Sequence, residues 1–230
     1  MSPRLPFKLS AVIFDMDGLM LDSEVIARTA WRQALAEQGR TLSDDFFNQM
    51  LGRTTDDTRT LLRQAFGPEL PVEALVQRKR QYVMDEVAQH GMPVKAGLWE
   101  LLEWLESQSI AKAVASSARR EDVEQKLVRA GLQGRFDAVV TGDQVEHGKP
   151  APDIFLAAAR QVRAPSGECV VLEDSDVGLQ AAHAAGMWPL MVPDLKPPSA
   201  ESRVWARGIF ATLSEVKNYL AAERPAAGPA

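Results

Sequence analysis

The chain has 230 residues, of which 46% are hydrophobic and 25% are charged, so it can bury a sizeable core and is typical of a globular protein of one or two domains. A formal net charge of −5 argues against nucleic acid or an anionic membrane as the main partner, because both bind a basic surface. The apolar runs are too short to span a membrane and no apolar signal segment follows the N-terminus, so we expect a cytoplasmic protein. One cysteine and three scattered histidines exclude an intramolecular disulfide and the usual kind of zinc site.

Short apolar runs alternate with amphipathic segments along most of the chain. The first run, residues 9–14, leads directly into Asp15 and is typical of a strand that is buried on both faces. Similar runs follow, and segments with helical spacing of apolar residues lie between them. This alternation predicts an α/β fold, a Rossmann-like parallel sheet with helices on both faces. The later strands are expected at residues 110–115, 136–141, 169–172 and 187–192, and the helices at 98–105, 123–130, 153–161 and 177–185.

One block interrupts the alternation. Residues 24–90 contain three helical patterns and no convincing strand, which indicates an all-α cap domain inserted after the first strand. We therefore expect a catalytic core made of residues 1–22 and 94–230 and a cap made of residues 23–93. A loop is expected at 193–202, and a frayed end at 223–230.

Polar side chains follow four of the predicted strands. Because ligands bind at the carboxyl ends of parallel strands, these side chains are expected to converge on one edge of the sheet. Each of them has an ordinary alternative role as a turn former, a helix cap or a solvated charge, so the prediction depends on the whole set. The set comprises Asp15 and Asp17 after the first strand, Ser116 and Ser117 after the second, Lys149 after the third, and Glu173 and Asp174 after the fourth.

Such a set suits phosphate chemistry. Several carboxylates at one point repel each other unless a cation joins them, and ligands that offer only oxygen favour Mg²⁺. A lysine and a serine hydroxyl can bind a phosphate dianion, one carboxylate can attack phosphorus, and a second can move protons. Residues 142–149 do not form a P-loop, because five residues separate the two glycines and Pro150 replaces the required Ser or Thr.

Four segments resemble, in order and spacing, the four motifs of the haloacid dehalogenase-like hydrolases. The helical insert between the first two resembles the small cap of the β-phosphoglucomutase-like subfamily. The four segments are residues 14–18 with 21–24, residues 115–117, residues 147–155, and residues 170–175 with Gly178 and the alanines that follow it.

The resemblance implies a role for each residue of the set. Asp15 is expected to be the nucleophile and a Mg²⁺ ligand, and Asp17 the general acid and base, with its backbone carbonyl on the metal. The other expected roles are phosphate binding by Ser116, Ser117 and Lys149 and metal binding by Asp174, with Glu173 beside it or acting through water.

The implied function is Mg²⁺-dependent hydrolysis of a small phosphorylated metabolite, a sugar phosphate or one like a nucleoside monophosphate, through an aspartyl-phosphate. The first alternative is a phosphosugar mutase of the β-phosphoglucomutase type. Ala27 stands where the mutase has a cap histidine and Thr55 where it has an arginine, so hydrolysis is favoured. Arg53 and Lys79 are candidate cap contacts to substrate, although both also suit an ordinary surface role. The second alternative is a non-catalytic protein that binds phosphometabolites; in every case we expect a monomer or weak dimer.

Overall fold

The computed structural model describes residues 5–50, 55–194 and 197–222, and it divides the chain into two compact units. The core unit is Met1–Asp22 with Pro93–Ala230, and the helical unit is Ser23–Met92. The division places Pro93 in the core unit, one residue away from the boundary expected from the sequence. Among the described residues, no helix is both long and apolar enough to cross a membrane.

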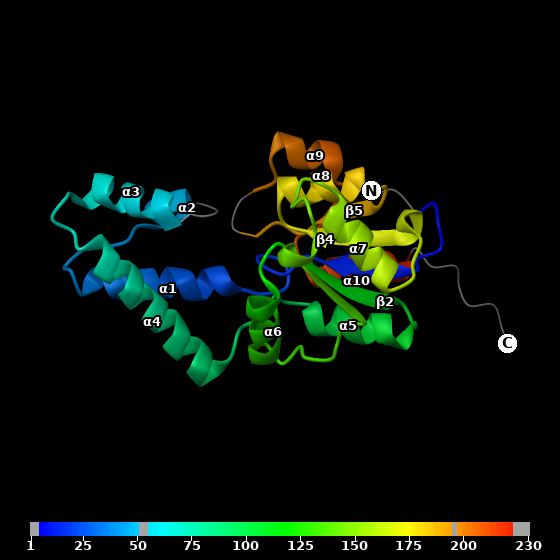
Figure 1. The fold of residues 1–230 in the computed structure, drawn as a ribbon, viewed down its shortest axis with the longest axis horizontal. Coiled ribbons are helices and arrows are strands. Elements are labelled where there is room, and N and C mark those ends of the chain that lie inside the picture. Colours follow the sequence, from blue (N-terminus) through cyan, green and yellow to red (C-terminus); the bar gives the residue numbers. More distant parts are fainter. Residues whose placement is uncertain (1–4, 51–54, 195–196, 223–230) are drawn as a thin grey trace. The chain divides into compact units, whose positions relative to one another are not determined.

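The core unit carries a six-stranded parallel sheet in the order β3-β2-β1-β4-β5-β6 (Figure 1). β1 lies between β2 and β4, with Phe14 paired in register with Val114 and Leu172. The predicted fold class is confirmed. The elements of the core unit are β1 (Ala11–Phe14), α5 (Leu98–Ser107), β2 (Ala111–Ser116), α6 (Arg120–Arg129), β3 (Ala138–Thr141), α7 (Asp153–Gln161), β4 (Cys169–Glu173), α8 (Asp176–Ala184), β5 (Trp188–Met191), α9 (Ala200–Trp205), β6 (Gly208–Ile209) and α10 (Leu213–Ala222).

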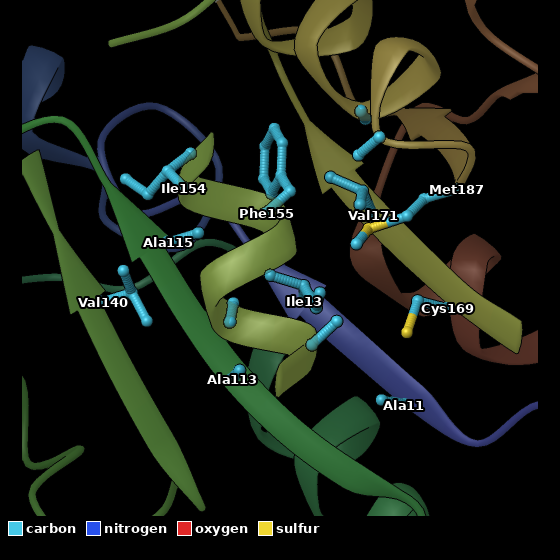
Figure 2. Packing of buried hydrophobic residues seen from close by; sticks show 14 of the residues in the cluster. Ala11, Ile13, Ala113, Ala115, Val140, Ile154, Phe155, Cys169, Val171 and Met187 are labelled. Atoms are coloured by element: carbon cyan, nitrogen blue, oxygen red, sulfur yellow. The ribbon is translucent and has the colours of Figure 1, made fainter. Parts of the chain in front are cut away.

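Small and branched side chains let the helices approach the sheet closely. On one face, Ile154 and Phe155 of α7 pack onto residues that alternate along the strands, such as Ile13, Ala113 and Val171 (Figure 2). α8 joins the same cluster, while α5 lies on the other side of the strands (Figure 1). With both faces covered, the strands become continuous apolar runs, and the polar chemistry is confined to the loops at their ends.

The helical unit contains α1 (Ser23–Ala36), α2 (Asp44–Met50), α3 (Thr55–Phe66) and α4 (Val72–His90). α1 packs along α4 through a separate apolar cluster that includes Trp31, Leu35 and Leu75. α2 was not expected from the sequence, because at seven residues it is too short to display a clear helical period.

The two chain segments that lead into and out of the helical unit are joined within the core unit. The backbone N–H of Asp22 donates to the carbonyl of Pro93 at 2.9 Å, and the N–H of Lys95 donates to the carbonyl of Met20 at 2.8 Å. Leu21 and Val94 form an isolated antiparallel bridge between these bonds. The chain therefore leaves the core and returns to it at the same place.

The C-terminal part of the core differs from the expected loop. The prediction of a loop over residues 193–202 was wrong at its end, since α9 begins at Ala200. Ser199 caps this helix by accepting a hydrogen bond from the backbone N–H of Ser202, so the loop ends at Ser199. The expected frayed end, 223–230, lies outside the described residues.

Candidate active site

The central strands deliver the predicted residues to one edge of the sheet. Asp15 directly follows β1, and its backbone N–H donates to the carbonyl of Leu172 in β4 at 3.0 Å. Ser116 ends β2 and Glu173 ends β4, the two neighbours of β1. Because the three strands are parallel and in register, their last residues meet around Asp15.

Lys149 connects these strand ends. Its Nζ donates hydrogen bonds to Oδ1 of Asp15, to Oε1 of Glu173 at 2.6 Å and to the carbonyl of Ala115 at 3.3 Å. The side chain is only 6% exposed and its ammonium lies 4.9 Å from the ring centre of Phe155. Burial alone would lower the pKa of Lys149, but the carboxylates of Asp15 and Glu173 raise it above its usual value, so the group stays charged.

Glu173 accepts a hydrogen bond from Lys149 and is itself fixed by further hydrogen bonds. Its Oε2 accepts hydrogen bonds from the backbone N–H of Asp174 and of Ser175, both at 3.1 Å, and from the Ser175 hydroxyl at 2.8 Å. Its side chain is fully buried, and Gly178 of α8 packs so closely that an added Cβ would overlap the carboxyl group. Both oxygens of Glu173 are therefore engaged within the protein, which suits a positioning role better than direct metal binding.

Asp174 turns toward the loop after β1. A Cβ added to Gly18 would lie 2.9 Å from Cγ of Asp174 and 3.4 Å from Oδ2 of Asp194, so both carboxylates line the same loop. Gly18 has φ +88°, a conformation that favours glycine, and its missing side chain leaves the space that the Asp174 carboxyl occupies. Asp194 in turn accepts a hydrogen bond from Lys95, which also donates to Asp22 at 3.0 Å.

The two predicted phosphate-binding serines differ in their surroundings. Ser116 is 2% exposed, and its Oγ accepts a hydrogen bond from the backbone N–H of Ala118 at 3.2 Å. Its hydroxyl hydrogen remains able to donate to a phosphate oxygen. Ser117 is exposed, and its backbone carbonyl packs against Gly142.

Asp17, the expected acid and base, is paired with a residue that the sequence did not single out. Nζ of Lys126, on α6, donates to Oδ1 of Asp17 at 2.6 Å. The side chain of Asp17 is 42% exposed, in contrast to Asp15 at 13%. The two aspartates of the first loop therefore occupy different environments, one buried and one open to solvent.

Negative charge exceeds positive charge at this edge of the sheet. Burial, together with the charges of Glu173 and Asp17, raises the pKa of Asp15 to about 7 although Lys149 opposes the shift. Burial and the charges of Glu173, Asp15 and Asp194 raise the pKa of Asp174 to about 8. Lys149 contacts both Asp15 and Glu173, and its one positive charge does not compensate these two carboxylates and Asp174, so a further cation would stabilise their ionised forms.

The donor set fits Mg²⁺. Among the residues that the structure describes, no group of three or more His, Cys, Asp or Glu side chains is arranged to hold a metal ion. Mg²⁺ does not require such a group, because it is usually bound by one or two carboxylates with waters and substrate phosphate oxygens as the other ligands. Asp15 and Asp174 provide two carboxylates with excess negative charge at the same loop.

Neither of the two expected substrate contacts of the cap belongs to the core unit. Arg53 lies outside the described residues. Lys79 belongs to the helical unit, where it is half-buried and its ammonium lies 5.7 Å from the ring centre of Trp31. Burial lowers the pKa of Lys79, and the charge of Glu24 partly opposes this. Lys79 is therefore no simple solvated charge, and its contact with substrate stays a prediction.

Sequence reasoning missed the lysines Lys95 and Lys126. Neither adjoins a strand end or a motif: Lys95 follows the insertion, and Lys126 lies in the last turn of α6. Their long side chains reach carboxylates more than 70 residues away in the chain, a pairing that no local pattern reveals.

Comparisons with known proteins give a consistent result. The family model described as haloacid dehalogenase-like hydrolase matches residues 12–192. The fructose-1-phosphate phosphatase of Escherichia coli is 34% identical over 182 residues, which cover 78% of this chain and 94% of that protein. The protein Suppressor of quenching 1 of Arabidopsis thaliana is 39% identical over 188 residues, but this chain spans only 17% of its length. A crystal structure of a HAD family hydrolase from Deinococcus radiodurans, with bound phosphate and sodium, superposes with a TM-score of 0.81 at 27% identity and covers 94% of this chain and 96% of that one.

Proposed function

Since the chain belongs to the haloacid dehalogenase-like hydrolases, we propose that it is a phosphatase that hydrolyses small phosphorylated metabolites at the edge of the sheet that carries Asp15. The observation that supports this most directly is the buried group of Asp15, Lys149 and Glu173, contributed by three separate segments of the core unit. It combines a carboxylate nucleophile with a fixed positive charge for a phosphate dianion.

In the first half of the reaction, an oxygen of Asp15 attacks phosphorus and the bond from phosphorus to the leaving oxygen breaks. Asp17 gives its proton to that oxygen, so the product alcohol departs neutral. Lys149 and the hydroxyl of Ser116 bind the oxygens of the phosphoryl group during the transfer, and Glu173 holds Lys149 in place. The product of this step is an aspartyl-phosphate.

In the second half, water attacks the phosphorus of the aspartyl-phosphate. Asp17, now a carboxylate, accepts a proton from the water, and the bond between phosphorus and the Asp15 oxygen breaks to release phosphate. Asp17 is thereby protonated again for the next cycle. Its exposure suits both proton transfers, because substrate and water reach an open side chain more readily than a buried one.

Asp15 and Asp174 would hold Mg²⁺ together with the backbone carbonyl of Asp17. The ion would neutralise the excess carboxylate charge and the charge of the phosphoryl oxygens. Glu173 is assigned a positioning role, since its oxygens already accept hydrogen bonds from Lys149, Asp174 and Ser175.

A sugar phosphate is the substrate class that we favour. The relative from Escherichia coli is named a fructose-1-phosphate phosphatase, and a second relative, 31% identical over 182 residues, is named a phosphorylated carbohydrates phosphatase. These names also favour phosphate release over the mutase alternative.

The test is release of inorganic phosphate from a panel of hexose phosphates, pentose phosphates and nucleoside monophosphates with Mg²⁺. We expect turnover that a chelator abolishes and that Asp15→Asn reduces by at least about a thousandfold, because the nucleophile is removed. Arg129→Met, on the exposed surface of α6, is the matched control and should retain the activity. Turnover that survives Asp15→Asn would refute the proposal, and so would binding of the panel without phosphate release by the unmodified protein.

A further inference from the structure

Lys126 reaches the proposed acid and base from a helix that carries none of the sequence motifs. Its Nζ donates to Oδ1 of Asp17 at 2.6 Å, across 109 residues of chain. Both residues belong to the core unit, so their contact does not depend on where the helical unit lies.

The packing of α6 fixes the backbone position from which the Lys126 side chain extends. α6 begins soon after the turn at Ser116 and packs onto the core through Val123, which is fully buried, and Leu127, which is 6% exposed. Lys126 directly precedes Leu127 and is half-buried. The packing of α6 therefore holds the backbone of Lys126 in place, and this limits the positions that its ammonium group can reach.

The Asp17 carboxyl group has no comparable support from its own loop. It is 42% exposed, and within the part of the chain that the structure describes, Lys126 is the only side chain that hydrogen-bonds to it. An open aspartate side chain exchanges between rotamers unless a contact selects one. The Lys126 ammonium supplies that contact.

The pairing also differs from those of the other lysines at this edge. Lys149 donates a hydrogen bond to the nucleophile Asp15, and Lys95 donates one to Asp194. Lys126 alone among the three bonds to the group that transfers protons. Because the pair is partly exposed to solvent, its contribution to folding stability is small, so its effect is expected in the orientation of Asp17.

We propose that Lys126 is a positioning residue that holds the Asp17 carboxyl group in the orientation from which it protonates the leaving oxygen. The proposal rests on the proposed function and adds to it a residue outside the motifs. Misplacement of a reacting group by about 1 Å can cost a large factor in rate, so the loss of Lys126 should slow the step that uses the Asp17 proton.

Substrates whose leaving groups differ in acidity distinguish a positioning role of Lys126, which acts through Asp17, from a general structural role. In phosphoryl transfer to Asp15, the electron pair of the broken P–O bond goes to the leaving oxygen, which takes the proton of Asp17. A phenolate needs this proton, whereas 4-nitrophenolate is stable without it. A residue that acts through Asp17 therefore affects phenyl phosphate more than 4-nitrophenyl phosphate, and kcat/KM reports this step because it covers events up to departure of the phenol.

The experiment compares kcat/KM for the two esters in the unmodified protein, Lys126→Met, Lys126→Arg and the control Arg129→Met. We expect Lys126→Met to lose about tenfold with phenyl phosphate and less than about twofold with 4-nitrophenyl phosphate. Lys126→Arg should recover most of the loss, since it restores a donor to Asp17, and Arg129→Met should leave both values unchanged. Equal losses with both esters, no loss with either, or the same selective loss in Arg129→Met would each overturn the proposal.

Two further measurements keep the outcomes distinct. Thermal unfolding should show Lys126→Met and Lys126→Arg within a few degrees of the unmodified protein; if Lys126→Met is less stable, all variants are assayed at a temperature at which Lys126→Met is fully folded. Asp15→Asn tests the proposed function by itself. An inactive Asp15→Asn combined with equal losses in Lys126→Met refutes only the role of Lys126, whereas an active Asp15→Asn refutes the proposed function.

Discussion

Gly178→Ala tests whether the position of Glu173 controls the active site. In an unhindered helix, alanine in place of glycine is favourable by roughly 1 kcal/mol. At position 178 the added Cβ would lie closer than 3.0 Å to the carboxyl group of Glu173, which is fully buried and cannot move into solvent. Overpacking costs about 1–3 kcal/mol, and each weakened hydrogen bond to the charged carboxylate costs about 1.5–3 kcal/mol more.

The expected net loss is about 3 kcal/mol in the free energy of unfolding, or roughly 6–12 °C in Tm for a chain of this size. Because Glu173 holds Lys149, kcat/KM for phosphate esters should also fall by about ten- to a hundredfold. Gly167→Ala is the matched control, since an added Cβ there meets nothing within 4 Å, and we expect a change of less than about 0.5 kcal/mol. Unchanged Tm and activity in Gly178→Ala would refute the reasoning.

Three more predictions concern the same edge of the sheet. Lys149→Met leaves the buried carboxylates of Asp15 and Glu173 without their cation and should lower the free energy of unfolding by about 3–5 kcal/mol, measured by denaturant titration; an unchanged midpoint would contradict this. Because the pKa values of Asp15 and Asp174, about 7 and 8, lie above their ordinary value, stability in chelator should fall as pH rises from about 4 to 8, and Mg²⁺ should raise Tm more at pH 8 than at pH 5; equal shifts would count against a metal at these carboxylates. Ser175→Ala removes the cap of α8 and one donor to Glu173, so unfolding should become easier by about 1–2 kcal/mol, and a neutral result would show that the cap is dispensable.

The sequence was informative where local patterns carry the structure. The strands of the core were predictable because burial on both faces demands continuous apolar runs, as in Ala11–Phe14 and Cys169–Glu173. The family resemblance read from the four motifs is confirmed by the match over residues 12–192. β6 and α10 went unpredicted: Gly208–Ile209 is too short to display a strand period, and its pairing with β5 exists only in three dimensions.

In the candidate site, the residues that follow the strands were predictable from the sequence, but the pairing of their side chains was not. The convergence of Asp15 and Glu173 follows from parallel topology, because Asp15 directly follows β1 and Glu173 ends β4, and Lys149 reaches both from the loop that follows β3. The engagement of both Glu173 oxygens was not predictable, since it depends on how closely Gly178 approaches. The assignment of each lysine to its carboxylate likewise depends on rotamers and helix placement, which a motif does not encode.

The junction around Asp22 and Pro93 has a consequence for how such a protein can change over evolutionary time. The excursion of the chain through the helical unit, Ser23–Met92, begins after Asp22 and ends before Pro93, and a 2.9 Å backbone hydrogen bond joins these two residues. The helical unit is therefore inserted into the core unit as a loop whose two ends are held together. Lengthening a closed loop costs little conformational entropy, only about 0.6 kcal/mol for each doubling. The excursion can therefore be exchanged for one of different size or sequence while the register of β1 and β2 stays intact, so the sheet tolerates large changes in this one module.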